Sequence, residues 1–263
     1  MAIVKASGFI LVSLLMSMGA LPSLIAADDQ ATDNLIKTSQ NPVGHMASLA
    51  LLNNFNLGYG PDSDLQHQLK IQPTIPFTLG NDWSLITKHV LPVYCQSWPR
   101  DSSGLGNLQQ FFAFVPPQQG EWLMGAGAGF EYPTSTNGAI GSNRVSASPV
   151  GVIEYSKGSF LAAVSAYNFW SFGSDTVNEM TIQPLLHYNL GNRYFLSSAP
   201  TISANWTAAP GERWTLPLGG GGGRLFFVDK MPMIVAVQGY YNVLSPTDQA
   251  DWTVRVFAQF IFS

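Results

Sequence analysis

The feature that most constrains this chain is a two-residue alternation of apolar and polar side chains, repeated in segments of about ten residues. In DLQHQLKIQPTIPFTLG, Leu65, Leu69 and Ile71 share one set of alternate positions, and Gln68 and Lys70 share the other. A pleated strand places these sets on opposite faces, whereas a helix would scatter them around its circumference. The final segment, DWTVRVFAQFIFS, repeats the pattern. The chain is therefore expected to be all-β.

Composition favours a membrane environment for these strands. Only 11% of the residues are charged and 46% are hydrophobic, whereas roughly 25% of the residues in a typical soluble domain are charged. No apolar run after the N-terminus is long enough for a transmembrane helix. Because lipid cannot satisfy backbone amides, strands that cross a membrane must close on themselves. The sequence predicts a closed antiparallel transmembrane β-barrel.

The N-terminal residues 1–27 are predicted to be a cleaved signal peptide. Lys5 is the only charge before Asp28, and the apolar stretch between them is broken by Pro22 and ends in small residues. An uncleaved membrane anchor is the alternative. Residues 28–45 are polar and lack a period, so we expect a flexible periplasmic lead-in or a plug. Residues 46–263 are expected to form the barrel.

The connections between the extended segments differ in length. Longer polar stretches such as QSWPRDSSGLG and PTSTNGAIGSNR mostly alternate with short turns such as LGND, SKGS and LGNR. Outer-membrane barrels have an even strand number, short periplasmic turns and longer external loops. The segments number about twelve, which is an ordinary size for such a barrel. We therefore expect an integral protein of a bacterial outer membrane, surrounded by lipid.

Aromatic residues gather at the ends of the predicted strands. Indole rings favour the headgroup level of a membrane, where an apolar ring and a polar edge are both satisfied. The predicted aromatic girdle comprises Trp83, Trp98, Trp122, Trp170, Trp206, Trp214 and Trp252. Phe260 and Phe262, close to the C-terminus, are predicted to form the signal that the barrel-assembly machinery reads.

Several stretches resemble a large group of Gram-negative envelope proteins. They include NPVGHMASLALLNNFNLGYGPDSDLQHQLKIQPTIPF, LLHYNLGNRYFLSSAPTISANW and RWTLPLGGGGGRLF. Members of this group are described as transporters, as "MetA-pathway of phenol degradation-like" proteins or, misleadingly, as "neuromedin U". The resemblance covers residues 45–263. It implies an outer-membrane β-barrel that serves as an uptake channel for small solutes, hydrophobic or aromatic compounds among them. It implies no catalytic or ligand-binding residues.

The polar faces of the strands are predicted to line the lumen and to set what passes through it. The predicted lumen-lining residues are Gln66, Gln68, Lys70, Gln72, Glu154, Gln183, His187, Arg255 and Gln259. Lys70, Arg255 and Glu154 are suited to paired charges. A barrel of about twelve strands lies between barrels that side chains fill and barrels with a wide channel. Both a conducting and a packed lumen are compatible with the sequence.

Three functions follow from these patterns. The first is a channel for passive passage of small solutes, and the second is a plugged barrel with a structural or surface-interaction role. The third is a membrane-embedded lipid hydrolase, but no histidine among His45, His67, His89 and His187 has a serine and an acid nearby in sequence. We therefore predict no enzyme, no catalytic residue, no metal and no cofactor. The net charge of −4 argues against nucleic acid as a partner.

Two features conflict with regular strands. Prolines, which cannot donate to a ladder, fall within predicted strands at Pro73, Pro76, Pro92, Pro149, Pro184, Pro200, Pro217 and Pro232. One hypothesis is that they weaken the wall locally, so that an apolar solute can leave sideways into lipid. The alternative is a set of bulges without consequence. The run Gly219–Gly223 interrupts the alternation and predicts a further bulge.

Overall fold

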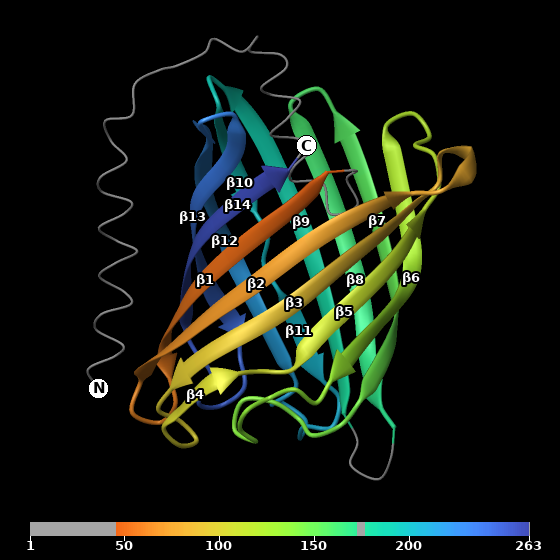
Figure 1. Ribbon diagram of the computed structural model, residues 1–263. Helices are drawn as coiled ribbons and strands as arrows, with labels where there is room; N and C mark the ends of the chain where they lie inside the picture. Colours follow the sequence, from red (N-terminus) through yellow and green to blue (C-terminus); the bar gives the residue numbers. More distant parts are fainter. Residues whose placement is uncertain (1–45, 173–176, 263) are drawn as a thin grey trace.

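The computed structural model describes residues 46–172 and 177–262, which form a closed antiparallel β-barrel (Figure 1). The predicted signal peptide, the predicted lead-in and Ser263 lie outside the described residues. Within the described part of the chain, no helix is long and apolar enough to span a membrane. The strands are β1 Ala47–Tyr59, β2 Asp64–Thr78, β3 Ser84–Gln96, β4 Ser102–Leu105, β5 Leu108–Val115, β6 Trp122–Tyr132, β7 Ser146–Lys157, β8 Phe160–Ser171, β9 Asn178–Gly191, β10 Tyr194–Ser198, β11 Ile202–Asn205, β12 Trp214–Val228, β13 Met231–Leu244 and β14 Trp252–Phe262. A 3-10 turn, η2 Gly80–Asp82, connects β2 to β3.

The fourteen segments make a wall of twelve strands, because two wall positions are each shared by two short strands. β4 and β5 both pair with β3, at its end and its beginning respectively. β10 and β11 both pair with β9 on one side and with β12 on the other. The ring closes where β14 pairs antiparallel with β1, from Ala47–Phe262 to Leu57–Trp252. The predicted closed barrel of about twelve strands is confirmed.

The two rims of the barrel carry different connections. The short-turn rim holds the turns at 79–83, 116–121, 158–159, 192–193 and 229–230, together with the start of β1 and the end of β14. The opposite, long-loop rim holds the connections at 60–63, 97–101, 133–145, 206–213 and 245–251, together with the end of β8 and the start of β9. Figure 1 shows the C-terminal end of β14 at the top of the barrel and the loop between β1 and β2 at the bottom. This sorting matches the loop pattern expected from the sequence.

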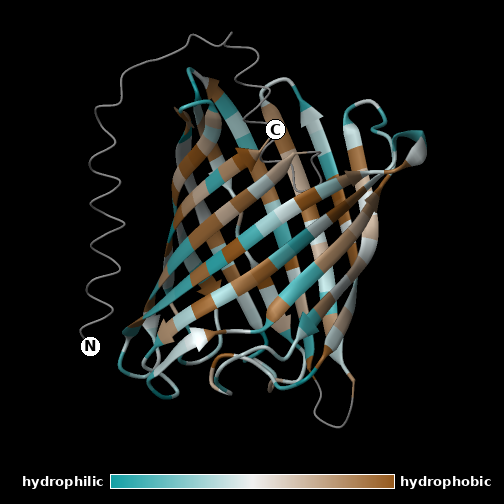
Figure 2. Ribbon diagram, in the orientation of Figure 1, coloured by the Kyte–Doolittle hydropathy of each residue, from teal (hydrophilic) through white to brown (hydrophobic). Residues whose placement is uncertain are grey.

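The outer face of the wall is apolar. Teal and brown bands follow one another along many of the strands, as Figure 2 shows. Leu186 and Leu196 are 51% and 52% exposed, and Val237 is 51% exposed. In contrast, the intervening residues His187, Ser197 and Gln238 are buried inside the barrel. A surface this rich in exposed aliphatic side chains suits lipid rather than water.

The interior is not uniformly polar, which the sequence analysis did not anticipate. Near the short-turn rim, one inward cluster comprises Phe195, Leu225, Ile234, Ala236 and Ile261. A second comprises Ile86, Ala113, Val115, Leu123 and Val152. Polar side chains are more frequent toward the long-loop rim, where Gln66 donates to Gln96 Oε1 at 2.8 Å. The apolar clusters pack this end of the lumen as side chains pack a small barrel.

The bulge predicted at Gly219–Gly223 is wrong. The ladder between β12 and β13 is regular from Pro217–Asn242 to Val228–Met231, and its register shifts earlier, between Leu216 and Pro217. A Cβ at Gly221 would collide with the carbonyl oxygen of Val237. The glycines therefore interrupt the apolar–polar alternation without breaking the pairing, because they let neighbouring backbones approach closely.

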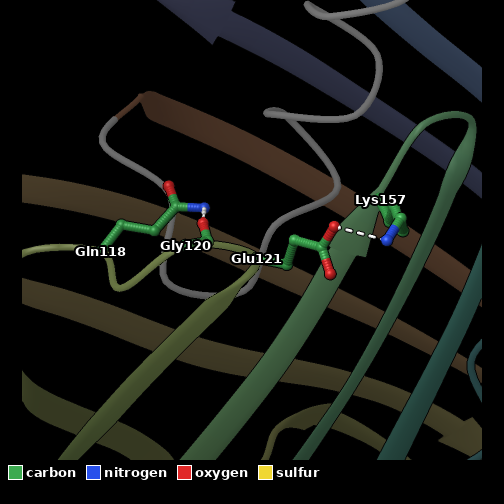
Figure 3. A network of polar contacts seen from close by, with 4 residues as sticks. All are labelled: Gln118, Gly120, Glu121 and Lys157. Atoms are coloured by element: carbon green, nitrogen blue, oxygen red, sulfur yellow. Dashed lines mark hydrogen bonds and ion pairs between the residues drawn. The ribbon is translucent and has the colours of Figure 1, made fainter.

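At the short-turn rim, polar contacts join neighbouring elements at the surface. Lys157 Nζ lies 2.9 Å from Glu121 Oε1, and Gln118 Nε2 donates to the Gly120 carbonyl at 3.1 Å (Figure 3). The Lys157 and Glu121 side chains are 67% and 41% exposed. Because water screens the attraction between exposed charges, we regard this network as a minor tie between the turn 116–121 and β7.

The predicted girdle residues lie at strand ends or in the adjoining loops. Trp122, Trp170 and Trp252 are 47%, 46% and 51% exposed. Trp98 instead packs edge-on against Tyr59, with ring centroids 5.8 Å apart. The half-buried Trp206 donates from its indole Nε1 to Asn168 Oδ1 at 2.9 Å. Contact of these rings with lipid headgroups stays a prediction.

Candidate functional site in the barrel lumen

Three adjoining cavities occupy the lumen. The central cavity has a volume of about 190 Å³ and reaches from Lys70 and Lys88 to Arg255 and Phe257. The loop-side cavity, of about 150 Å³, lies toward the long loops and is lined by Asn and Gln side chains of β1 and β2. The aromatic cavity, of about 90 Å³, is lined by residues of β2, β3, β5, β7, β8 and β9. Lys70 lines all three, so they are neighbouring compartments of one lumen.

The side chains of the nine predicted lumen-lining residues are distributed over this interior. Lys70, Gln72, Gln183, Arg255 and Gln259 line the central cavity. Gln66 and Gln68 line the loop-side cavity. Glu154 and His187 are 3% and 1% exposed and line none of the three cavities. The structure thus brings seven of the nine residues to cavities and leaves two packed in the inner wall. Whether these residues set selectivity stays a prediction.

Cationic groups concentrate at the central cavity. β2 supplies the ammonium of Lys70, β3 that of Lys88, and β14 the guanidinium of Arg255. Among residues 46–172 and 177–262, Lys70 and Lys88 form no hydrogen bond or ion pair. No aspartate or glutamate is among the described residues that line the three cavities. The cavities are therefore positively charged although the whole chain carries a net charge of −4.

Arg255 is held in place by contacts with three other strands or connections. Its Nε donates to Asn54 Oδ1 at 2.8 Å, and its Nη1 donates to the carbonyl of Ala199 at 2.8 Å. The guanidinium carbon lies 5.1 Å from the centroid of the Tyr240 ring. Asn54 Nδ2 in turn donates to Gln68 Oε1 at 3.1 Å. Because these partners fix the plane of the guanidinium, the remaining N–H groups of Arg255 have a fixed position and direction.

The pairing of Lys70 or Arg255 with Glu154, which the sequence suggested, is not formed by the described residues. Glu131, another inward acid, accepts from Asn107 Nδ2 at 3.1 Å and from Gln109 Nε2 at 2.8 Å. Its carboxylate is thus engaged with amides of the long-loop end. Among the described residues, neither Glu131 nor Glu154 lines the central cavity beside its cations.

Phe111 and Tyr167 are among the residues that line the aromatic cavity. The rings of Phe111 and Tyr167 have centroids 4.9 Å apart, and Phe169 lies 5.4 Å from Tyr167. Lys70 and Lys88 line this cavity as well as the central one. The lumen therefore places two ammonium groups next to an aromatic wall.

Sequence reasoning missed Lys88, Tyr167 and Phe111 as lumen residues. Lys88 shares its inward stripe with Ile86 and Val90, so the face did not look polar. Lys88 is four residues after Ser84, which also faces inward, and strand residues separated by an even number share a face. This spacing was the one feature of the sequence that pointed to an inward Lys88. The inward aromatic rings carried no signal of this kind.

Three of the in-strand prolines meet at one place in the wall. The strand formed by β10 and β11 is interrupted at 199–201, hereafter the wall break. The pairs Leu186–Ser198 and Ile182–Ile202 flank it, and their common register sets Pro184 opposite Pro200. On the other side of the break lies Pro217 of β12, next to the register shift. Since proline lacks an N–H, this stretch cannot complete its ladder.

Lumen side chains replace the missing ladder bonds at the wall break. The N–H of Ala199 donates to Tyr240 Oη at 2.9 Å, and its carbonyl accepts from Arg255 Nη1 at 2.8 Å. On the inside, Pro184 and Ala199 line the central cavity. On the outside, a shallow apolar groove of about 410 Å³ follows Leu186, Leu196 and neighbouring residues. The groove lies over paired residues of β9, β10 and β12 beside the break, whereas at the break itself the backbone of Ala199 is held by side chains.

The interior also contains a buried histidine with polar neighbours. His187 Nε2 lies 2.8 Å from Asn189 Oδ1, and Ser197 is the cross-strand partner of His187. Ser197 Oγ accepts a hydrogen bond from Gln238 Nε2 at 2.8 Å. These side chains are 1–7% exposed, and His187 and Ser197 also border the apolar groove on the outer side. Among the described residues, no group of three or more His, Cys, Asp and Glu side chains could hold a metal ion.

No protein-family model and no curated protein sequence matches the chain. Among solved structures, it is similar to the COG4313 outer membrane channel from Pseudomonas putida F1, with a TM-score of 0.63 and 14% identity. That similarity covers 84% of this chain and 99% of the other. It is also similar to the outer membrane phospholipase (OMPLA) dimer with bound calcium from Salmonella typhi, at a TM-score of 0.42 and 15% identity, over 88% of this chain and 98% of that one.

The fold is that of an outer-membrane β-barrel. The twelve-strand closed wall defines this class, and the similarity to the Pseudomonas putida channel over nearly the whole of that protein agrees with it.

Proposed function

We propose that this chain is an integral outer-membrane channel through which small solutes, hydrophobic and aromatic ones among them, pass passively. The observation that carries the proposal is the set of three adjoining cavities inside a closed barrel, with Lys70 in the lining of each. The fold is shared with an outer membrane channel. No energy source or cofactor enters this proposal. Residues 1–27 would serve as the export signal, and Phe260 and Phe262 as the signal for the barrel-assembly machinery.

Conductance of the mature protein in planar lipid bilayers tests the proposal. We expect discrete conductance steps that change when Lys70 or Arg255 is replaced, because both line the central and loop-side cavities. A Val237→Ala variant, altered only on the outer face, should conduct like the wild type. Complete silence of the wild-type protein would favour the plugged structural barrel instead. Conductance that appears only when residues 28–45 are deleted would assign those residues the role of a plug.

The cells that make the protein provide the test of substrate class. A strain that lacks the gene should take up aromatic and fatty compounds more slowly than the wild type, and complementation should restore the rate. Equal uptake rates in the two strains would contradict a role in the passage of hydrophobic solutes.

We also propose that the wall break is the route by which an apolar solute leaves the lumen sideways into lipid. Support comes from Pro184 and Ala199, which line the central cavity, and from the apolar groove on the outer side. Closure by Tyr240 and Arg255 involves two side-chain hydrogen bonds. Rotation of these side chains requires no strand to leave the barrel. The alternative is that the three prolines are bulges without a transport role.

A disulfide across the break tests this route. Cysteines in place of Pro184 and Pro200 should pin β9 to the strand opposite it, in a background where the free Cys95 is replaced by serine. We expect slower transfer of a fluorescent apolar probe into the bilayer, reversed by reduction, with ion conductance retained. A cysteine pair at Val235 and Ala258, where the ladder is intact, is the control. Equal transfer rates in both cross-linked proteins would refute the sideways route.

A further inference from the structure

We propose that the centre of the lumen is a binding site for a carboxylate attached to an aromatic ring. The ammonium groups of Lys70 and Lys88 and the guanidinium of Arg255 would hold the carboxylate, and the Phe111–Tyr167 wall would hold the ring. This inference deepens the proposed channel function, on which it rests, because it names the chemical class of the solute.

The charge of the site determines the sign of its ligand. Burial of cations without acidic partners is unfavourable unless an anion compensates them. Within residues 46–172 and 177–262, the lining of the central cavity holds no acid, and neither lysine has a hydrogen-bond or ion-pair partner. An entering anion supplies the missing charge. A cation would be repelled by three like charges.

The geometry of Arg255 determines the kind of anion. Its Nε and Nη1 are engaged with Asn54 and Ala199, which fixes the plane of the guanidinium while further N–H groups stay free to donate. A fixed guanidinium favours planar oxyanions, which accept two parallel hydrogen bonds. Gln72 and Gln183, which also line the central cavity, add amide donors. This combination suits a carboxylate better than a spherical halide ion.

The neighbouring compartment determines what the carboxylate can carry. Lys70 and Lys88 line both the central cavity and the aromatic cavity, whose lining includes Phe111, Tyr167 and Val152. A ring in this compartment would stack on aromatic side chains while its carboxylate stays beside the lysines. The aromatic cavity, at about 90 Å³, is smaller than the roughly 150 Å³ apolar cavity that holds benzene, so the ligand would extend into the adjoining central cavity of about 190 Å³. A single-ring carboxylate therefore fits the two compartments together.

Binding of benzoate to the purified, detergent-solubilised protein tests the proposal, with benzamide as the neutral probe of the same shape. We expect benzoate to bind at least about tenfold more tightly than benzamide, because only benzoate compensates the buried cations. The double variant Lys70→Met/Lys88→Met should lose this preference. Lys230→Met, which removes an exposed lysine from the turn 229–230, is the matched control and should retain it. Equal affinity for the two probes in the wild type would overturn the proposal.

A second measurement covers the case in which the double variant does not fold. In planar bilayers, benzoate should block the chloride current of the wild-type channel, and the block should weaken as salt is raised, since salt screens the attraction. Benzamide at the same concentration should not block. Chloride conductance that benzoate leaves unchanged would refute the carboxylate site while the channel function stands. Benzoate binding by a protein that never conducts would refute the channel function instead.

Discussion

Replacement of Tyr240 by phenylalanine should destabilise the barrel at the wall break. The phenol oxygen is the acceptor for the N–H of Ala199 at 2.9 Å, and Tyr240 is 2% exposed. The neighbouring strand β9 offers no other acceptor for the Ala199 N–H, because its ladder with β10 and β11 is interrupted between Ser198 and Ile202. A buried donor that loses its partner raises the free energy of the folded state by about 1–3 kcal/mol. Tyr240 also borders the loop-side cavity. A water molecule that enters from this cavity and accepts from the Ala199 N–H would reduce the loss of stability to the lower end of this range.

The free energy of unfolding of the Tyr240→Phe variant can be measured by urea titration in lipid vesicles, followed by tryptophan fluorescence. Tyr241→Phe is the matched control, since this neighbouring side chain faces outward and is 45% exposed. We expect a loss of about 1–3 kcal/mol for Tyr240→Phe and a smaller change for the control. Amide exchange at Ala199 should accelerate in the first variant only. Equal stability of the two variants would refute the claim that Tyr240 closes the wall.

Three further outcomes are expected. Val237 lies in the middle of β13 on the outer face, and its replacement by arginine should lower the free energy of unfolding in vesicles by about 2–4 kcal/mol. Val228 lies beside the turn 229–230, and Val228→Arg should lower it by only about 0–1 kcal/mol. Equal losses in the two variants would contradict the proposed depth of these residues in the membrane. Phospholipid hydrolysis by the purified protein should not depend on His187, so an activity that His187→Ala abolishes would favour the lipid hydrolase. Hydrogen bonds from the N–H and hydroxyl of Thr247 lower the pKa of the Glu212 carboxyl. Ionised Glu212 therefore stabilises the contact between the loops 206–213 and 245–251 fully above the unfolded pKa of 4.5. This contact should weaken as pH falls through the lower pKa of the folded state. An NMR titration of the Glu212 carboxyl that is unchanged by Thr247→Val would contradict this.

The wall and its two faces could be predicted from the sequence because strand alternation is a local property. Gln66, Lys70 and Arg255 belonged to polar stripes that the chain displays directly, and they lie inside. Lys88 was missed because Ile86 and Val90 share its stripe, and only Ser84 marked that face as one that admits polar side chains. The closure of the wall break depends on Tyr240 and Arg255, which lie 41 and 56 residues from Ala199. No local pattern reports contacts of that separation.

The bulge was misplaced for a related reason. A glycine run predicts freedom of the backbone, but it does not show whether that freedom serves a bulge or a close approach. At Gly221 the neighbouring carbonyl of Val237 leaves no room for a Cβ, and only the assembled sheet reveals this. The division of one wall strand into β10 and β11 likewise required the positions of three prolines from three different strands.

The seam between β1 and β14 links assembly to binding. Arg255 reaches Asn54 across 201 residues of sequence, so the third cation joins the central cavity only when the last strand docks on the first. A ring that has not yet closed holds two lysines but lacks the guanidinium that orients a carboxylate. The proposed carboxylate site would then form in one step, when β14 pairs with β1. A barrel that has not yet closed would lack this site.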